Sequence, residues 1–236
     1  MLIISKKKFF LIMSFIAFTA VSIIVIEAYM LPAFAKKPVG KVLIDAGHGF
    51  PDGGAIGMNG SIESTLNIKL ARLVKKKLIK KDYSVIMTRE DENAVADEGK
   101  TIAKRKYSDM VKRLEMINSS GADMLVSIHM NKFPDSRYKG AQVLFSSNYT
   151  ESEILAKQIQ AELCAIPENE SKRSFLKAPS SIYLMKNSTI PAVIVECGFL
   201  SNFEEEQLLN TPEYMEKIAT AIVDGITNYY KEVQNN

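Results

Sequence analysis

The sequence predicts a single α/β domain with a mostly parallel central sheet of about five to six strands and helices on both faces. Two observations lead to this prediction. Apolar runs of strand length alternate along the chain with segments of helical period, and the runs are nearly all apolar, as buried parallel strands are. The alternation begins after a separate apolar stretch near the N-terminus. The chain is therefore divided into a terminal segment, 1–35, and a folded domain, 36–236.

The terminal segment is predicted to be a signal or a membrane anchor. Three lysines at 6–8 precede an apolar run from Phe9 to Ile26, close to the length that spans the hydrocarbon core as a helix. The flanking lysines favour a cytoplasmic N-terminus, so the domain is expected outside the cytoplasm. It is either membrane-anchored or secreted after cleavage at 33–35, and the long apolar run favours the anchor.

Five strands and the helices between them follow from the pattern in chain order. The strands are expected at 41–45, 84–88, 124–129, 142–145 and 192–195. Apolar stripes predict helices over 66–78 and 103–117, and a third helix from Glu151 to about Ala165. Ser201 and Glu204 resemble a capping box that opens a short helix, and Thr211 with Pro212 predicts the N-cap and first residue of the last helix.

Composition excludes some partners and leaves two loops to explain. The lysines at 75–77 and 80–81 fall on the polar side of a predicted helix, so no nucleic-acid partner is expected. Cys164 and Cys197 are too few for a disulfide scaffold and are expected to be buried free thiols. The polar stretches 91–100 and 168–180 lack periodicity, and we expect them to wall a substrate groove or to contact a partner.

The two histidines of the chain are the first candidates for chemistry. His48 follows the strand predicted at 41–45, and His129 ends the strand predicted at 124–129. Reacting groups of open α/β sheets gather at the carboxyl ends of the strands. If these two strands are neighbours in the sheet, the two imidazoles lie together.

A carboxylate would complete a metal site, because zinc in hydrolases is commonly held by two histidines and one carboxylate, with a fourth position open. Glu63 is the best third ligand, since it follows a Gly-rich loop at 53–60 and falls in the first turn of a helix. The alternative is a glutamate placed there only to stabilise the helix N-terminus.

Glu196 is the candidate general base. It closes the apolar strand 192–195 and would face the same sheet edge, where it could take a proton from an attacking water and pass it to a leaving amine. No convincing Ser/His/Asp or Cys/His arrangement competes, and no GxSxG motif is present.

The motifs around these residues resemble a known family. The segments 44–49, 52–55, 127–131 and 195–202, together with Gly57 and Glu63, are similar to the zinc-dependent N-acetylmuramoyl-L-alanine amidases over about 41–230. The resemblance implies that 36–236 is a zinc amidase domain. It also implies that His48, Glu63 and His129 bind one Zn²⁺ per chain and that Glu196 is catalytic.

Asn131 and Arg113 match family positions near the site, where the resemblance implies that they orient ligands or substrate. The family often has Pro where Ala46 stands and Gly where Phe50 stands, so the fine geometry of the loop beside His48 is not carried over. Within the family, the chain is most similar to the sporulation amidases that prepare cortex peptidoglycan for muramic-δ-lactam formation and germination.

The resemblance implies peptidoglycan as substrate, a position facing the forespore cortex, and contact with the membrane through the N-terminal segment. An accessory or activating protein is a further expected partner. Two other functions stay open at this point. One is a different peptidoglycan metallohydrolase, either a peptidase or a deacetylase, and the other is a non-catalytic wall-binding module.

Overall fold

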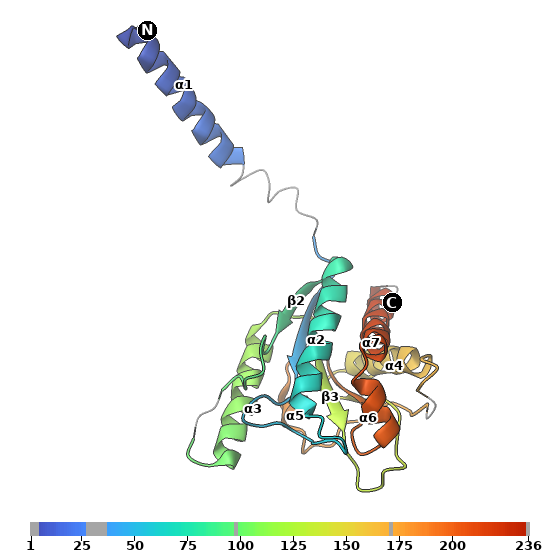
Figure 1. The fold of residues 1–236 in the computed structure, drawn as a ribbon. Coiled ribbons are helices and arrows are strands. Elements are labelled where there is room, and N and C mark those ends of the chain that lie inside the picture. Colours follow the sequence, from blue (N-terminus) through green and yellow to red (C-terminus); the bar gives the residue numbers. More distant parts are fainter. Residues whose placement is uncertain (1–4, 27–36, 97–98, 170–171, 235–236) are drawn as a thin grey trace. The chain divides into compact units, whose positions relative to one another are not determined.

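The computed structural model describes residues 5–26, 37–96, 99–169 and 172–234. They fall into two units, divided between Pro38 and Val39 (Figure 1). The second unit is an α/β fold whose six-stranded sheet has the order β2-β1-β3-β6-β4-β5. The strands are β1 (Lys41–Ala46), β2 (Ser84–Met87), β3 (Met124–Asn131), β4 (Gln142–Phe145), β5 (Leu176–Lys177) and β6 (Ala192–Phe199).

The sheet is mostly parallel, as predicted. Strands β2, β1, β3 and β6 run parallel to one another, whereas β4 pairs with β6 in the antiparallel sense and with β5 in the parallel sense. The five strands expected from the sequence are all present. The sixth, β5, was not expected, because its two residues are both exposed and carry no apolar run.

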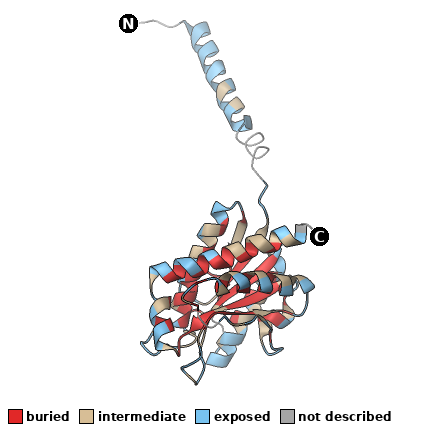
Figure 2. Cartoon of the chain, turned by 90° about the vertical axis from the view of Figure 1, so that its right-hand side faces the viewer, coloured by how far each residue is buried: buried red, intermediate tan, exposed pale blue. Residues whose placement is uncertain are grey.

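Helices cover both faces of the sheet, which confirms the predicted layers. One face packs under α2 (Glu63–Lys80), α4 (Thr150–Cys164) and α7 (Pro212–Gln234), and the other under α3 (Ile102–Ser119) and α5 (Tyr183–Asn187). Burial follows the alternation of the strands, since Val42 and Ile44 join the first core and Leu43 the second. Figure 2 shows this buried layer along the strands and the inner sides of the helices.

Two predicted helix starts have different outcomes. Thr211 caps α7, because its Oγ1 accepts a hydrogen bond from Tyr214 N at 3.3 Å. The capping box at Ser201 was wrong: the N-cap of α6 (Phe203–Leu209) is Asn202, whose Oδ1 accepts from Glu205 N at 3.0 Å. The Ser201 hydroxyl instead accepts from Phe133 N at 3.0 Å.

The cysteines are free thiols, as predicted. Cys197 is buried inside β6, but the prediction that both are buried was wrong for Cys164. Cys164 is the last residue of α4 and is only half-buried, with its Sγ 3.5 Å from the carbonyl of Arg173.

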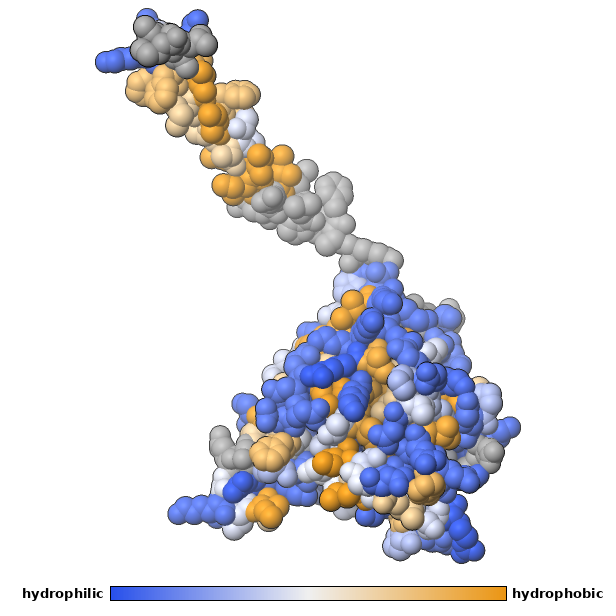
Figure 3. All heavy atoms as spheres, in the orientation of Figure 1, coloured by the Kyte–Doolittle hydropathy of each residue, from blue (hydrophilic) through white to orange (hydrophobic). Residues whose placement is uncertain are grey.

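The first unit contains helix α1 (Lys6–Val25), capped by Ser5, whose hydroxyl accepts from Lys8 N at 3.4 Å. The helix has a mean hydropathy of 2.3 and none of it is buried within the protein. Its surface is largely apolar in Figure 3. Helix α1 is therefore long and apolar enough to cross a membrane, a property that signal sequences share. The predicted cleavage site at 33–35 lies outside the described residues.

Candidate metal centre

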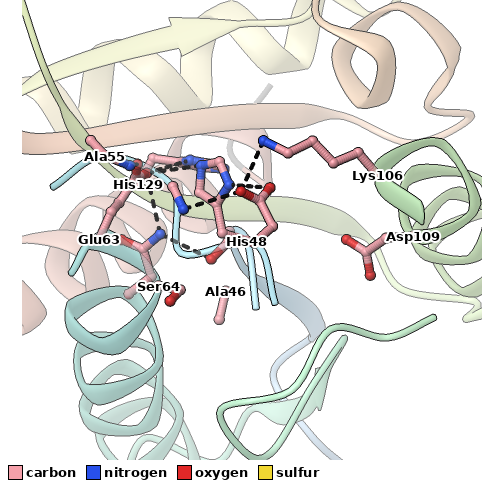
Figure 4. Close-up of polar contacts among 12 residues, drawn as sticks. Ala46, His48, Ala55, Glu63, Ser64, Lys106, Asp109 and His129 are labelled. Atoms are coloured by element: carbon pink, nitrogen blue, oxygen red, sulfur yellow. Dashed lines mark hydrogen bonds and ion pairs between the residues drawn. The ribbon is translucent and has the colours of Figure 1, made fainter. Parts of the chain in front are cut away.

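Three residues from three different elements meet at the carboxyl edge of the sheet. His48 lies in the loop after β1, Glu63 is the first residue of α2, and His129 lies in β3. One ligand atom from each lies within 4.8 Å of those of the other two. Figure 4 shows the three side chains turned toward one another. The structure therefore brings together the three residues that the sequence singled out as metal ligands.

The Glu63 carboxylate is at the middle of this group. Its Oε1 lies 2.9 Å from His129 Nδ1 and 3.3 Å from His48 Nε2, and its Oε2 accepts from Ala55 N at 2.8 Å. Burial opposes ionisation of this carboxyl, but the hydrogen bonds from His129 and His48 outweigh it and hold the pKa well below the usual range. Glu63 is therefore ionised, which is the form that binds a metal.

His48 is oriented by Asp52, whose Oδ2 lies 2.9 Å from His48 Nδ1. This contact leaves Nε2 to face Glu63. Although burial alone would lower it, hydrogen bonds to Asp52 and Glu63 raise the pKa of His48 to about 9. With this pKa, His48 is protonated at neutral pH in the absence of a metal. A metal ion at the site would displace the proton from the binding nitrogen, because histidine binds metals in its neutral form. A carboxylate behind a ligating imidazole is a common support of metal sites.

Glycines make the close approach of these side chains possible. His48 has a φ of 61° and Gly54 a φ of 70°, so the loop folds back between β1 and α2. A Cβ on Gly54 would lie 2.5 Å from Glu63 Oε2 and 2.7 Å from His48 Cδ2. A Cβ on Gly47 would lie 2.2 Å from His129 Cε1. The glycines therefore let the backbone turn tightly around His48.

The donor set fits zinc. Two imidazole nitrogens and one carboxylate oxygen are the ligands of many zinc hydrolases. Zinc bonds of about 2.0–2.1 Å in a tetrahedron place neighbouring ligand atoms about 3.3 Å apart. The separations of 3.3 Å between His48 Nε2 and Glu63 Oε1 and of 2.9 Å between His129 Nδ1 and Glu63 Oε1 are close to that spacing.

Glu196 stands beside this group, on β6. Its Cα is the register partner of His129 on the adjacent strand β3. Within the part of the chain that the structure describes, its Oε2 is buried without a hydrogen-bond partner. Burial raises the pKa of this carboxyl, and the nearby Glu63 charge adds to the effect. A carboxyl with a raised pKa at a reacting centre is suited to accept and return a proton.

A cavity of about 700 Å³ opens next to these groups. His48, His129 and Glu196 are among the residues that line it. The other walls come from the loop after β1, from α3 and from the residues at the start of α5. Ala94 and Ala96 also line it, so part of the polar stretch 91–100 forms a wall of the groove, as expected. Residues 97–98 of that stretch lie outside the described residues.

Arg113 holds the loop that carries His48. The side chain is fully buried, with its Nη1 2.5 Å from Asp45 Oδ1 and its Nε 2.7 Å from Asp109 Oδ2. Its Nη2 donates to the His48 carbonyl at 2.5 Å. A side chain so enclosed supports the position of a ligand and does not contact substrate. Of the two roles that the resemblance allowed, the geometry therefore favours orientation of a ligand.

Asn131 lies two residues beyond His129, at the end of β3. It is half-buried, and its carbonyl accepts from Leu200 N at 2.8 Å. This contact ties β3 to the residue that follows β6. The role of the Asn131 side chain stays a prediction.

Sequence reasoning missed two residues that touch the group. Asp52 was noted only as part of a motif, although its place four residues after His48 was a usable signal. Asn67, buried on α2, donates to the Gly47 carbonyl at 3.0 Å and to Glu63 Oε1 at 3.4 Å. A buried asparagine one helical turn after Glu63 indicates such a support.

The fold and the site together define a class of protein. Two imidazoles, an ionised carboxylate and a second carboxylate with one oxygen unpartnered among the described residues gather at the carboxyl edge of an α/β sheet, next to a cavity. This set of groups is typical of metal-dependent hydrolases.

Comparison with known proteins identifies the family. Residues 42–228 match the model of the N-acetylmuramoyl-L-alanine amidase family, so the chain belongs to this family and is an amidase of the bacterial cell wall. It is 40% identical over 195 residues to the germination-specific N-acetylmuramoyl-L-alanine amidase of Bacillus subtilis, covering 82% of this chain and 81% of the relative. The family resemblance deduced from the motifs is confirmed.

Two solved amidase structures have a similar fold. The chain is similar to the CwlD amidase from Clostridioides difficile in complex with the GerS lipoprotein, with a TM-score of 0.78 and 36% identity over 82% of this chain and 99% of that one. It also resembles an N-acetylmuramoyl-L-alanine amidase from Clostridium difficile 630, with a TM-score of 0.71 and 28% identity over 83% of this chain and 98% of that one. The predicted α/β architecture is therefore that of known amidases.

Proposed function

We propose that the chain hydrolyses the amide between the lactyl group of N-acetylmuramic acid and L-alanine with a zinc ion held by His48, Glu63 and His129, and with Glu196 as general base. The observation that carries the proposal is the buried Oε2 of Glu196, which lacks a partner among the described residues and lies beside the donor set. A buried polar atom left unpaired is costly, so its retention points to a role in the reaction.

Zinc bound there supplies Lewis acidity, which polarises the scissile carbonyl and makes a water acidic enough to attack at neutral pH. The protein's part is to hold and move protons. Glu196 accepts a proton from the attacking water and returns it to the nitrogen of the leaving L-alanine. One C–N bond is broken, and the products are a carboxylic acid on the lactyl group and a free amine on the peptide.

The supporting residues fix the geometry of this step. Asp52 holds His48 by its Nδ1, and Arg113 holds the carbonyl of the same residue. His129 and Glu196 are carried by two hydrogen-bonded strands. The catalytic carboxylate and one ligand therefore keep a fixed spacing, while the other two ligands are placed by the loop after β1 and the start of α2.

The test is metal content together with product analysis on purified cortex peptidoglycan, using the full chain in detergent. We expect about one zinc per chain and new amino termini that belong to L-alanine. Removal of the metal with a chelator should abolish release, and added zinc should restore it. Release at another peptide bond would identify a peptidase, loss of acetate would identify a deacetylase, and zinc without any release would favour a wall-binding module.

We further propose a role in the spore cortex. The relative with 40% identity is germination-specific, and an apolar helix like α1 suits export with or without anchoring. In this proposal, residues 1–35 direct the chain to the membrane and residues 36–236 act on the forespore cortex, where removal of the stem precedes muramic-δ-lactam formation. Spores that lack the protein should contain cortex without the lactam, and cortex of normal lactam content would contradict the proposal.

An accessory protein is a proposed partner. The CwlD amidase was solved in complex with a lipoprotein, and the ligands His48 and Glu63 of this chain come from a loop and a helix start, which a bound protein can stabilise. The zinc content of the chain purified alone, compared with that of the chain purified from sporulating cells, tests this proposal. Full zinc content and full activity in the isolated chain would remove the need for a partner.

A further inference from the structure

The cavity beside the metal centre has one cationic side chain that is tied directly to the site. Among the described residues that line it, Arg105 and Lys106 carry positive charge, and both belong to α3. Lys106 Nζ lies 2.9 Å from Asp52 Oδ1, and the other oxygen of Asp52 lies 2.9 Å from His48 Nδ1. Figure 4 shows Lys106 reaching from α3 toward His48.

The Lys106 ammonium has donors left for a ligand. An ammonium group offers three N–H donors, and the described contacts of Lys106 use one of them, for Asp52. Its side chain is 51% exposed, so the rest of the group faces the cavity and solvent. A partner entering the cavity can therefore bind Lys106 without displacing Asp52.

The neighbouring carboxylates do not compete for this ammonium. Asp109 Oδ2 lies 2.7 Å from Arg113 Nε, and Asp109 Oδ1 accepts from Val95 N at 2.7 Å. Asp45 is bonded to Arg113, Thr88 and Ser127. These acids are satisfied within the protein. The remaining donors of Lys106 are therefore open to water or to an acceptor group on a bound substrate.

The chemistry of the stem peptide supplies such an acceptor. In peptidoglycan, L-alanine is followed by a D-glutamate. The γ-carboxyl of this D-glutamate is linked to the next residue of the stem, so the α-carboxylate of the D-glutamate is free. Consecutive Cα atoms are about 3.8 Å apart, which places this carboxylate about one residue from the amide that is cut. Lys106 and the proposed ligand His48 contact the two oxygens of the same carboxylate, that of Asp52.

We infer that Lys106 is a specificity-determining residue that binds the free α-carboxylate of the second residue of the stem and selects it over a carboxamide at that position. The inference rests on the proposed function, because it places the stem in the cavity with the scissile amide at the metal centre. The competing explanation is that Lys106 only holds Asp52 in place. In that case its loss lowers the reaction of every stem equally.

The experiment uses the full chain in detergent and two soluble disaccharide–peptide substrates that differ only in an α-carboxylate or an α-carboxamide on the second residue. The readout is the ratio of the two kcat/KM values. Charge-assisted hydrogen bonds of this kind predict a preference for the carboxylate of about tenfold in the wild type. The Lys106→Met variant should bring the ratio close to one, whereas Lys106→Arg should keep part of it.

Lys112→Met is the matched control, because Lys112 lies on the same helix but pairs with Glu115 at the surface. It should leave the ratio at its wild-type value. A second measurement needs no variant: raising the salt concentration should reduce the wild-type ratio, since ions screen an exposed charge pair.

Three results would overturn the inference. They are a wild-type ratio near one, a ratio that survives in Lys106→Met, and a ratio insensitive to salt. Cleavage of neither substrate by the zinc-loaded wild type would instead overturn the proposed function, and the inference with it. The two failures are thus distinguishable, because only the second leaves no L-alanine amino termini from either substrate.

Discussion

His129 and Glu196 are register partners on the parallel strands β3 and β6. Both side chains leave the same face of the sheet at its carboxyl edge. Their spacing is set by backbone hydrogen bonds and does not depend on loop conformation. The part of the centre that carries the proposed general base is therefore held by two strands, and His48 and Glu63 come from a loop and a helix start.

Replacement of the base should separate chemistry from metal binding. We expect Glu196→Gln to lower the rate about 10²- to 10⁴-fold while the zinc content stays at the wild-type value. The unfolding free energy should not fall, because the buried Oε2 has no partner to lose among the described residues. Rate, zinc content and urea unfolding together check this. Glu204→Gln, at an exposed position of α6, is the control, and substantial activity in Glu196→Gln would refute the assigned role.

The support behind His48 should affect affinity for the metal more than the fold. Asp52→Asn keeps the shape of the side chain but removes the charge that faces His48 Nδ1. The loss of such a support typically weakens metal binding roughly 10- to 100-fold. Competition with a chromogenic chelator measures the affinity. An unchanged affinity would mean that the Asp52 contact is not a support of the metal site.

The glycine between the ligands should tolerate no side chain. Gly54→Ala places a Cβ at a φ of 70° and within 2.5 Å of Glu63 Oε2. The backbone conformation alone costs about 1–2 kcal/mol, and the contact displaces a ligand. We expect lower stability and loss of zinc together. Gly60→Ala is the matched variant, since Gly60 also has a positive φ but nothing within 4 Å of its Cβ; it should lose stability and retain zinc.

Acid should remove the contribution of a buried ion pair. The largest effect on Asp45, its burial, raises its pKa, but Arg113, Ser127 and other neighbours together lower it from 3.8 to about 2. A carboxyl with a lowered pKa stabilises the fold fully above its unfolded value, and the effect is lost as the pH falls through the folded value. Asp45→Asn should cost about 3 kcal/mol at neutral pH, because it leaves Arg113 partly unpaired.

The difference in unfolding free energy between wild type and Asp45→Asn should stay constant at pH values above the unfolded pKa of 3.8 and shrink as the pH falls toward 2. Urea unfolding of both proteins across this range measures it. A difference that grows toward low pH would have the wrong sign and would contradict the assignment of the ionised form to Asp45.

The sequence predicted the strands because each buried strand carries its own apolar signal, and it placed both histidines at one edge because parallel strands end together. It did not predict β5, a two-residue exposed strand, or α5, a helix of little more than one turn. Ser201 was predicted as a cap from its spacing to Glu204. That pattern cannot show that the Ser201 hydroxyl accepts a hydrogen bond from Phe133 N. The contact of Lys106 with Asp52 joins α3 to the loop after β1, and no local pattern reports such a contact.

The order of the strands affects when the enzyme becomes active. Strand β6 is the last in the chain but lies between β3 and β4 in the sheet. During synthesis and export from the N-terminus, His48, Glu63 and His129 emerge first, and the sheet stays open until the segment with Glu196 arrives. A chain that has not yet released β6 therefore has neither a closed sheet nor the proposed general base. If Glu196 is the base, this topology keeps the site incomplete until most of the domain has been made.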